Sequence, residues 1–216
     1  MSEGCNASDL RGRGLASLHY AIDKALTIGL QRRRPDLLFL HAAVIGQEEQ
    51  VVAVLAPTGG GKSTTALAAL EARLTIYSDE LAPIDLETLR VWPYPRALVL
   101  KHRPSSMTVH GRLRAARLGE RWYFPLHLGA WRPRSRRPRL NSLVILQTSH
   151  RTVTAMETIP PAHAMALVYS HCLNPLAHPR GGLPATRHLV STLPCYRLES
   201  GDPSQAVVLI RRLLGE

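Results

Sequence analysis

The sequence has few lysines and cysteines and no long apolar stretch. None of its apolar runs approaches the roughly 20 residues that a membrane-spanning helix needs. Residues 1–9 are polar and include two acids, unlike the basic start and apolar core of a secretory signal. We therefore expect a cytoplasmic protein without a membrane partner.

The three cysteines, Cys5, Cys172 and Cys195, lie far apart, and no C-x-x-C pair occurs. Neither a disulfide framework nor a zinc site is indicated by this spacing. A reducing compartment is the simplest setting for such a chain.

Arginine supplies nearly all of the basic charge, because the only lysines are Lys24, Lys62 and Lys101. The formal net charge is +11. Such a charge suits a nucleic-acid-binding protein, or an enzyme that handles phosphates and an acidic partner. No helix-turn-helix, zinc-finger or RNA-binding signature supports the first interpretation, so nucleic-acid binding is not expected.

The most informative stretch is 51–70, where an apolar β-branched run leads into a glycine-rich turn and then an alanine- and leucine-rich segment. The turn reads Ala56-Pro57-Thr58-Gly59-Gly60-Gly61-Lys62-Ser63-Thr64. A glycine turn between a strand and a helix, closed by Lys-Ser-Thr, is typical of a P-loop that binds nucleotide phosphates. Ala56 replaces the usual first glycine, a position where a small residue can serve.

The P-loop pattern predicts which groups contact the nucleotide. The predicted contacts are Thr58, Gly59, Gly60, Gly61, Lys62, Ser63 and Thr64. Glycines let backbone N–H groups surround an anion, and the following helix directs its positive end toward it. Lys62 is expected to reach the β- and γ-phosphates and Ser63 to hold Mg²⁺. The predicted cofactors are ATP, or another nucleoside triphosphate, and Mg²⁺.

Apolar spacing predicts an amphipathic helix over 10–30, with Leu15, Leu18, Ile22, Leu26 and Leu30 on one face. We assign residues 1–35 to an N-terminal helical extension and 36–216 to a catalytic domain. A buried strand over 37–45 is expected to form a hairpin-like pair with the strand at 51–56.

The remaining pattern predicts an α/β fold. Expected strands cover 74–77, 83–86, 89–92, 98–101, 143–146 and 195–198, and expected helices cover 161–173, 186–193 and 203–214. Loops are expected at 174–184 and in the arginine-rich stretch 131–139.

Asp79 and Glu80 are the best candidates for a catalytic base and a metal ligand. They follow a strand that should return to the edge of the sheet where the phosphates bind. The alternative is a pair of solvated acids in a turn. His41 lies in an apolar run, where a lone histidine is usually a core residue.

Taken together, Leu40-His41-Ala42-Ala43, the P-loop and Ser78-Asp79-Glu80 resemble the HPr kinase/phosphorylase family, most closely its short stand-alone members. The resemblance is good over 38–85 and loose over 36–214. It implies a P-loop kinase core of the HPr kinase and phosphoenolpyruvate carboxykinase type, with a mixed sheet and flanking helices.

The same resemblance implies roles for four residues. Asp79 would take the proton of an acceptor serine, and Glu80 would bind Mg²⁺ where the family has an aspartate. His41 would support the phosphate or the base, and Lys101 would lie near the transferred phosphoryl group. No clean counterpart of the family's phosphorolysis signature is present, which favours a pure kinase.

We therefore expect an ATP- and Mg²⁺-dependent serine kinase that acts on a protein or precursor peptide, including those of lasso-peptide pathways. A small-molecule kinase on the same core is one alternative. A nucleotide-switched regulatory or nucleic-acid-binding protein is another, supported by the arginine-rich loop. The sequence leaves open whether the protein forms a homo-oligomer.

Overall fold

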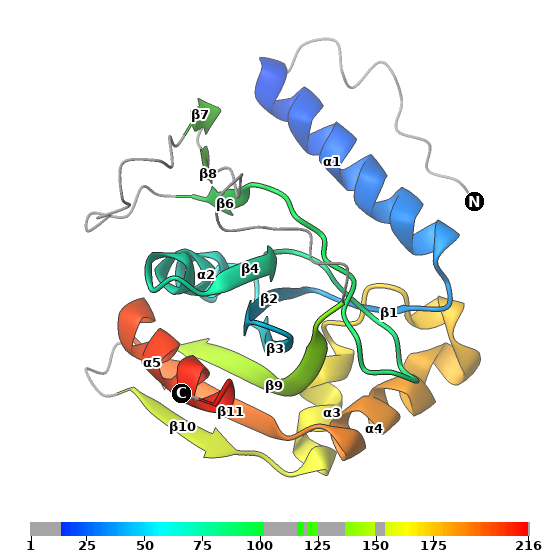
Figure 1. Cartoon of the computed structure of the whole chain (residues 1–216). Coiled ribbons are helices and arrows are strands. Elements are labelled where there is room, and N and C mark those ends of the chain that lie inside the picture. Colours follow the sequence, from blue (N-terminus) through cyan, green and yellow to red (C-terminus); the bar gives the residue numbers. More distant parts are fainter. Residues whose placement is uncertain (1–13, 102–115, 119–120, 125–136, 150–153, 216) are drawn as a thin grey trace.

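A six-stranded mixed sheet lies at the centre of the fold (Figure 1). Its strands, in spatial order, are β10 (Ala155–Thr158), β11 (Cys195–Ser200), β9 (Arg139–Thr148), β3 (Gln50–Leu55), β2 (Ala42–Gln47) and β4 (Thr75–Ser78). Strands β11, β9 and β3 are parallel, whereas β2 is antiparallel to both β3 and β4. Strand β4 therefore runs in the same direction as β3. The computed structural model describes residues 14–101, 116–118, 121–124, 137–149 and 154–215.

Helices cover both faces of this sheet (Figure 1). One face packs against α2 (Lys62–Glu71) and α5 (Pro203–Leu213), and the other against α3 (Pro161–Tyr169) and α4 (Leu183–Thr192). Strand β3 shows why both faces need cover, because its side chains alternate between the two apolar clusters and all are buried from Val51 to Leu55. The expected α/β fold with a mixed sheet and flanking helices is confirmed.

Two small sheets accompany the central sheet in the described part of the chain. Strand β1 (Leu38–Leu40) pairs with β5 (Ala82–Ile84), and β6 (Leu98–Leu100), β8 (Arg121–Phe124) and β7 (Ala116–Leu118) form a three-stranded sheet. Leu98, Leu100 and Phe124 join the apolar cluster that contains α2. Helix α2 therefore lies between the central sheet and the three-stranded sheet.

The hairpin-like pair before the glycine turn is confirmed, with β2 and β3 in register from Ala42↔Leu55 to Gln47↔Gln50. The single strand expected over 37–45 is wrong, because the chain changes sheets at His41. There the backbone N–H of His41 donates 2.8 Å to the carbonyl of His171, outside both sheets. Apolar periodicity does not reveal such a break, since the residues on both sides are buried.

Several other elements differ in extent from the expectation. Helix α3 ends at Tyr169, and the expected loop at 174–184 contains two short 3₁₀ turns, η2 (Pro175–Ala177) and η3 (Pro179–Gly182). Strands β7, β8 and β10 were not expected. Of the arginine-rich loop, residues 131–136 lie outside the described residues, and Arg139 already belongs to β9.

The expected N-terminal helix is present as α1 (Gly14–Arg33), but only part of its apolar stripe is buried: Leu30 packs against the cluster of Leu37, Phe39 and Leu81. Leu18, Ile22 and Leu26 are 41%, 51% and 62% exposed. Asp23, next to Ile22, forms an ion pair with Arg96. Among the described residues, no helix is long and apolar enough to cross a membrane.

Candidate functional site

The loop between β3 and α2, residues 56–61, is called the glycine loop below. Gly59 and Gly61 adopt positive φ angles of 83° and 84°, a backbone region that favours glycine. The Gly60 N–H donates 2.8 Å to the Pro57 carbonyl and closes the turn. Helix α2 starts at Lys62 without a side-chain cap and without an acid in its first turn. Its first N–H groups are therefore available to an anion at the positive end of the helix.

Gly61 is also held closely by the neighbouring strand. A Cβ atom added there would lie 3.1 Å from Cγ2 of Thr148, at the end of β9. A Cβ atom at Gly59 would meet nothing within 4 Å. The glycine loop is thus packed against the sheet on one side and open on the other.

Lys62 links the glycine loop to the acids after β4. Its side chain is buried, and Nζ donates 3.0 Å to the backbone carbonyl of Asp79. Strands β3 and β4 run in the same direction, so their carboxyl ends lie at the same edge of the sheet. In open α/β sheets this edge is where ligands bind.

Asp79 is 2% exposed, and its Oδ1 atom has no hydrogen-bond partner in the described part of the chain. Burial raises the pKa of this carboxyl group above its ordinary value. Lys62, a hydrogen bond from the Ser63 hydroxyl and the charge of Arg96 oppose that rise without cancelling it. The result is a proton acceptor with one unused oxygen beside a lysine.

The turn that carries the two acids is fixed by Ser78, which is fully buried. Its Oγ accepts hydrogen bonds from the backbone N–H groups of Glu80 at 3.3 Å and Leu81 at 3.0 Å. A serine at this position therefore sets the directions in which Asp79 and Glu80 leave the strand.

His41 lies next to Glu80. Its Nδ1 atom is 3.4 Å from Oε1 of Glu80 and 3.2 Å from the Glu80 backbone carbonyl. Burial, followed by the nearby charge of Lys62, lowers the pKa of His41 below 6.5, while Glu80 opposes the shift. The imidazole is therefore neutral at pH 7 and can donate one hydrogen bond to Glu80.

The structure does not join Lys101 to this group. Lys101 is exposed directly after β6, and no hydrogen bond or ion pair among the described residues connects it to Lys62, Asp79 or His41. Arg96, which sequence reasoning did not select as a site residue, is close enough to lower the pKa of Asp79. Arginine is so abundant in this sequence that one more before a strand gives no signal.

No group of three or more histidine, cysteine, aspartate and glutamate side chains is arranged to hold a metal within the described ranges. Mg²⁺ does not require three protein side chains, because it is usually held by one or two carboxylates together with phosphates and water. The Ser63 hydroxyl and the unpartnered oxygen of Asp79 are oxygen groups of the type that Mg²⁺ accepts. Glu80, predicted as a metal ligand, is partly exposed and contacts His41.

Comparison with known proteins does not assign this chain to a family. A scan against protein-family models finds no match, and a search of curated proteins finds no significant relative.

Proposed function

We propose that this protein is an ATP-dependent kinase that transfers a phosphoryl group to a serine hydroxyl of a protein or peptide. The observation that carries the proposal is the buried Asp79 carboxyl group, whose Oδ1 atom has no hydrogen-bond partner among the described residues. The backbone carbonyl of Asp79 accepts a hydrogen bond from Lys62, which follows the glycine loop. Leaving a buried polar atom unpaired costs stability, and such costs are typical of atoms reserved for a ligand.

The glycine loop would bind the phosphates of the donor. Its positive-φ glycines allow backbone N–H groups to face one anion, and the uncapped start of α2 adds the helix dipole. Lys62 would exchange its hydrogen bond to the Asp79 carbonyl for one to the β- and γ-phosphates. Thr58, Ser63 and Thr64 lie on the same loop and first turn.

Asp79 would act as the general base. A raised pKa brings a carboxylate closer to the acidity at which it removes a hydroxyl proton effectively. The neutral His41 would help to fix the position of Glu80 by donating a hydrogen bond to its backbone carbonyl, with the carboxylate close by. Mg²⁺, held by Ser63 and Glu80, would neutralise charge on the transferred group.

The choice of serine in a protein or peptide as acceptor rests on the resemblance of the His41, glycine-loop and Ser78-Asp79-Glu80 segments to HPr kinases. The central sheet and its flanking helices are compatible with that resemblance. Lys101 keeps its proposed place near the transferred phosphoryl group on the resemblance alone.

The test incubates the purified protein with ATP, Mg²⁺ and serine-containing candidate peptides, and reads intact mass. We expect a gain of one phosphate, located on serine. Lys62→Met should abolish nucleotide binding, whereas Asp79→Asn should keep binding and lower transfer by about 10²- to 10⁴-fold. Lys24→Met, on the exposed side of α1, is the matched control and should change neither.

The outcomes separate the parts of the proposal. Transfer by the Asp79→Asn variant at the normal rate would exclude Asp79 as the base. Transfer to a sugar or nucleoside but not to peptides would make the protein a small-molecule kinase. Nucleotide binding without any transfer, together with salt-sensitive DNA binding, would favour a nucleotide-switched nucleic-acid-binding protein.

A further inference from the structure

The segment that joins α3 to α4, residues 171–183, is called the leucine loop below; it includes the first residue of α4. It exposes three leucine side chains, since Leu173, Leu176 and Leu183 are 39%, 93% and 48% exposed. A single apolar side chain on a surface needs no explanation, but three in one short segment indicate a contact surface.

Two of these leucines come from neighbouring parts of the loop. Leu176 follows Pro175 in the sequence, and Leu183 follows Gly182. A Cβ atom added at Gly182 would lie 3.2 Å from Cα of Pro175, so these two preceding residues are in contact. The exposed leucines therefore belong to one folded-back segment rather than to separate parts of the surface.

Hydrogen bonds hold the leucine loop in place. Asn174 is buried, and its amide group accepts 2.9 Å from the Phe39 N–H and donates 2.8 Å to the Leu37 carbonyl. The Tyr169 hydroxyl donates 2.9 Å to the Gly181 carbonyl. Because the loop is fixed before any partner arrives, covering its leucines costs little ordering entropy.

The leucine loop begins beside the candidate site, next to β1 (Figure 1). The His171 carbonyl accepts 2.8 Å from the His41 N–H, and Cys172 then forms an antiparallel bridge with Leu40. His41 also contacts Glu80. A partner that covers the loop is therefore brought to the edge of the sheet where the two predicted acids lie.

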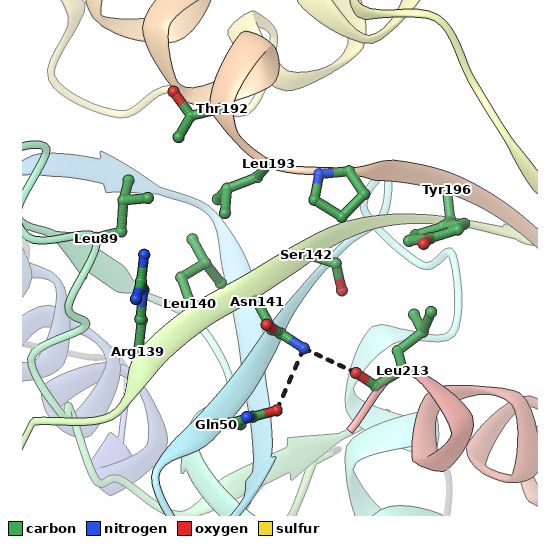
Figure 2. Close-up of a pocket in the computed structure, with 11 residues that line it drawn as sticks. Gln50, Leu89, Arg139, Leu140, Asn141, Ser142, Thr192, Leu193, Tyr196 and Leu213 are labelled. Carbon is green, nitrogen blue, oxygen red and sulfur yellow. Dashed lines mark hydrogen bonds between the residues drawn. The ribbon is translucent and has the colours of Figure 1, made fainter. Parts of the chain in front are cut away.

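The cavity drawn in Figure 2 lies at the other edge of the sheet. It has a volume of about 400 Å³ and begins at Gln50 and Arg139, where β3 and β9 start, whereas the glycine loop follows Leu55. Asn141, the extra residue of a β-bulge in β9, donates from its amide to Gln50 and Leu213 at 3.3 and 2.9 Å. The six residues of β3 span about 17 Å, so this cavity cannot hold the residues next to an acceptor serine.

The chain around the leucine loop is basic. No aspartate or glutamate occurs between Glu157 and Glu199. Within that range Arg180 and Arg187 are exposed, and no ion pair among the described residues involves either of them. A surface with exposed leucines and free positive charge is complementary to one with apolar and acidic side chains. Two copies of the loop would instead bring like charges together.

We propose that the leucine loop binds the acceptor protein or peptide, through a segment beside the serine that carries apolar and acidic side chains. This inference rests on the proposed kinase function and names the acceptor class for that same site. An apolar side chain of the acceptor would cover Leu176, and an acidic one would pair with Arg180. The loop contributes to acceptor affinity and not to the transfer step.

The test uses a fluorescein-labelled peptide, Asp-Glu-Leu-Ala-Leu-Asp-Glu, in which alanine stands where an acceptor serine would be. Matched peptides carry lysine in place of every acid, or alanine in place of both leucines. Binding to the full chain is followed by fluorescence anisotropy and by NMR shifts of backbone amides. We expect saturable binding of the first peptide with shifts at Leu173 and Leu183, and much weaker binding of both matched peptides.

Substitutions in the loop test the two contacts. Leu176→Ser should weaken peptide binding by about tenfold or more, because it removes apolar surface that the peptide covers. Arg180→Gln should weaken it by about two- to fivefold, a difference that disappears in roughly 1 M salt. Val208→Ser and Arg212→Gln are the matched controls, since both lie exposed on α5, which packs on the other face of the sheet. Neither control should change binding.

Kinetics place the effect at the binding step. With serine in place of the central alanine, Leu176→Ser should raise the KM for the peptide about tenfold and leave kcat and nucleotide binding unchanged. The unfolding midpoint of this variant should equal that of the natural protein, because the substituted side chain is almost fully exposed.

The proposal is wrong if either matched peptide binds as tightly as the first, if Leu176→Ser behaves like Val208→Ser, or if the shifts lie outside the leucine loop. Binding to anionic lipid vesicles without peptide binding would assign the surface to a membrane, and self-association that Leu176→Ser abolishes would assign it to a second copy. Peptide binding at the loop without transfer from ATP would count against the kinase proposal alone. Serine transfer that Leu176→Ser does not affect would count against the loop alone.

Discussion

Asp79 should destabilise the fold in which it is buried. Because its pKa is raised on folding, the folded chain holds this proton more tightly than the unfolded chain. As pH rises from 3.8 through the raised pKa, the unfolded state loses its proton first, and stability falls across that window. Asp79→Asn does not titrate, so its stability relative to the natural protein should increase from pH 4 to pH 7.

Urea unfolding at the two pH values measures this difference. We expect the variant to be less active but more stable at pH 7, a combination typical of catalytic groups. The conservative exchange Asp85→Asn is a useful comparison, because hydrogen bonds at Thr88 and Glu87 lower the pKa of Asp85 overall. Its pH-dependent stability is lost only below pH 3.8, so the stability of Asp85→Asn relative to the natural protein should change little between pH 4 and pH 7. An increase as large as that of Asp79→Asn would contradict the argument.

His41 provides a second test at the residue scale. Its pKa should lie below 6.5, because burial and Lys62 disfavour the charged ring. The fold should therefore gain stability as pH rises from this lowered pKa to 6.5, and lose it in acid. NMR titration should give a higher pKa in Lys62→Met and a lower one in Glu80→Gln. A shift of the same sign in both variants would mean that neither charge acts on the ring as described.

Among the elements, the glycine loop yields a prediction from its two positive φ angles. An alanine in that region costs about 1–2 kcal/mol on conformation alone. Gly59→Ala should lower the free energy of unfolding by only that amount, since a Cβ there meets no described atom within 4 Å. Gly61→Ala should cost more, because its Cβ would press on Thr148 at 3.1 Å. The free energies of unfolding in urea distinguish the two, and equal losses would show that Thr148 moves aside freely.

The elements also show what sequence patterns could and could not supply. The strand, glycine turn and helix from Val51 onward were predictable, because β-branched residues, glycines and alanines each favour one local structure. The order of elements likewise placed Asp79 near Lys62. The break at His41 was not predictable, since it depends on a hydrogen bond to His171, 130 positions away in sequence and distant in any local window.

The side on which helix α1 contacts the rest of the protein was not predictable for a related reason. Its period was read correctly, but the side that faces the protein is decided by partners at Tyr94 and Arg96, which no helical pattern contains. The bulge at Asn141 likewise depends on how β9 pairs with β3. Local chemistry was therefore predictable, whereas burial imposed by distant segments was not.

For the whole molecule, the proposed boundary near residue 35 can be tested by removing residues 1–33. Neither of the two large apolar clusters includes a described residue of α1, so the central sheet should fold without it. The loss includes the Asp23–Arg96 ion pair, the Thr27–Tyr94 hydrogen bond and the contact of Leu30 with the Leu37 cluster. It also includes the ring contacts of His19 and Tyr20 with β8. Together these should contribute on the order of 2 kcal/mol.

Urea unfolding of the shortened chain should therefore remain a single cooperative transition at a lower midpoint. The double substitution Asp23→Asn and Thr27→Val in the full chain is the matched control, because it removes the polar contacts and leaves the helix in place. This double substitution should account for part of the loss, and the remainder should reflect Leu30 and the ring contacts of His19 and Tyr20 with β8. A shortened chain that unfolds gradually would show that α1 belongs to the same cooperative unit as the central sheet, because a helix outside that unit cannot change how the sheet unfolds.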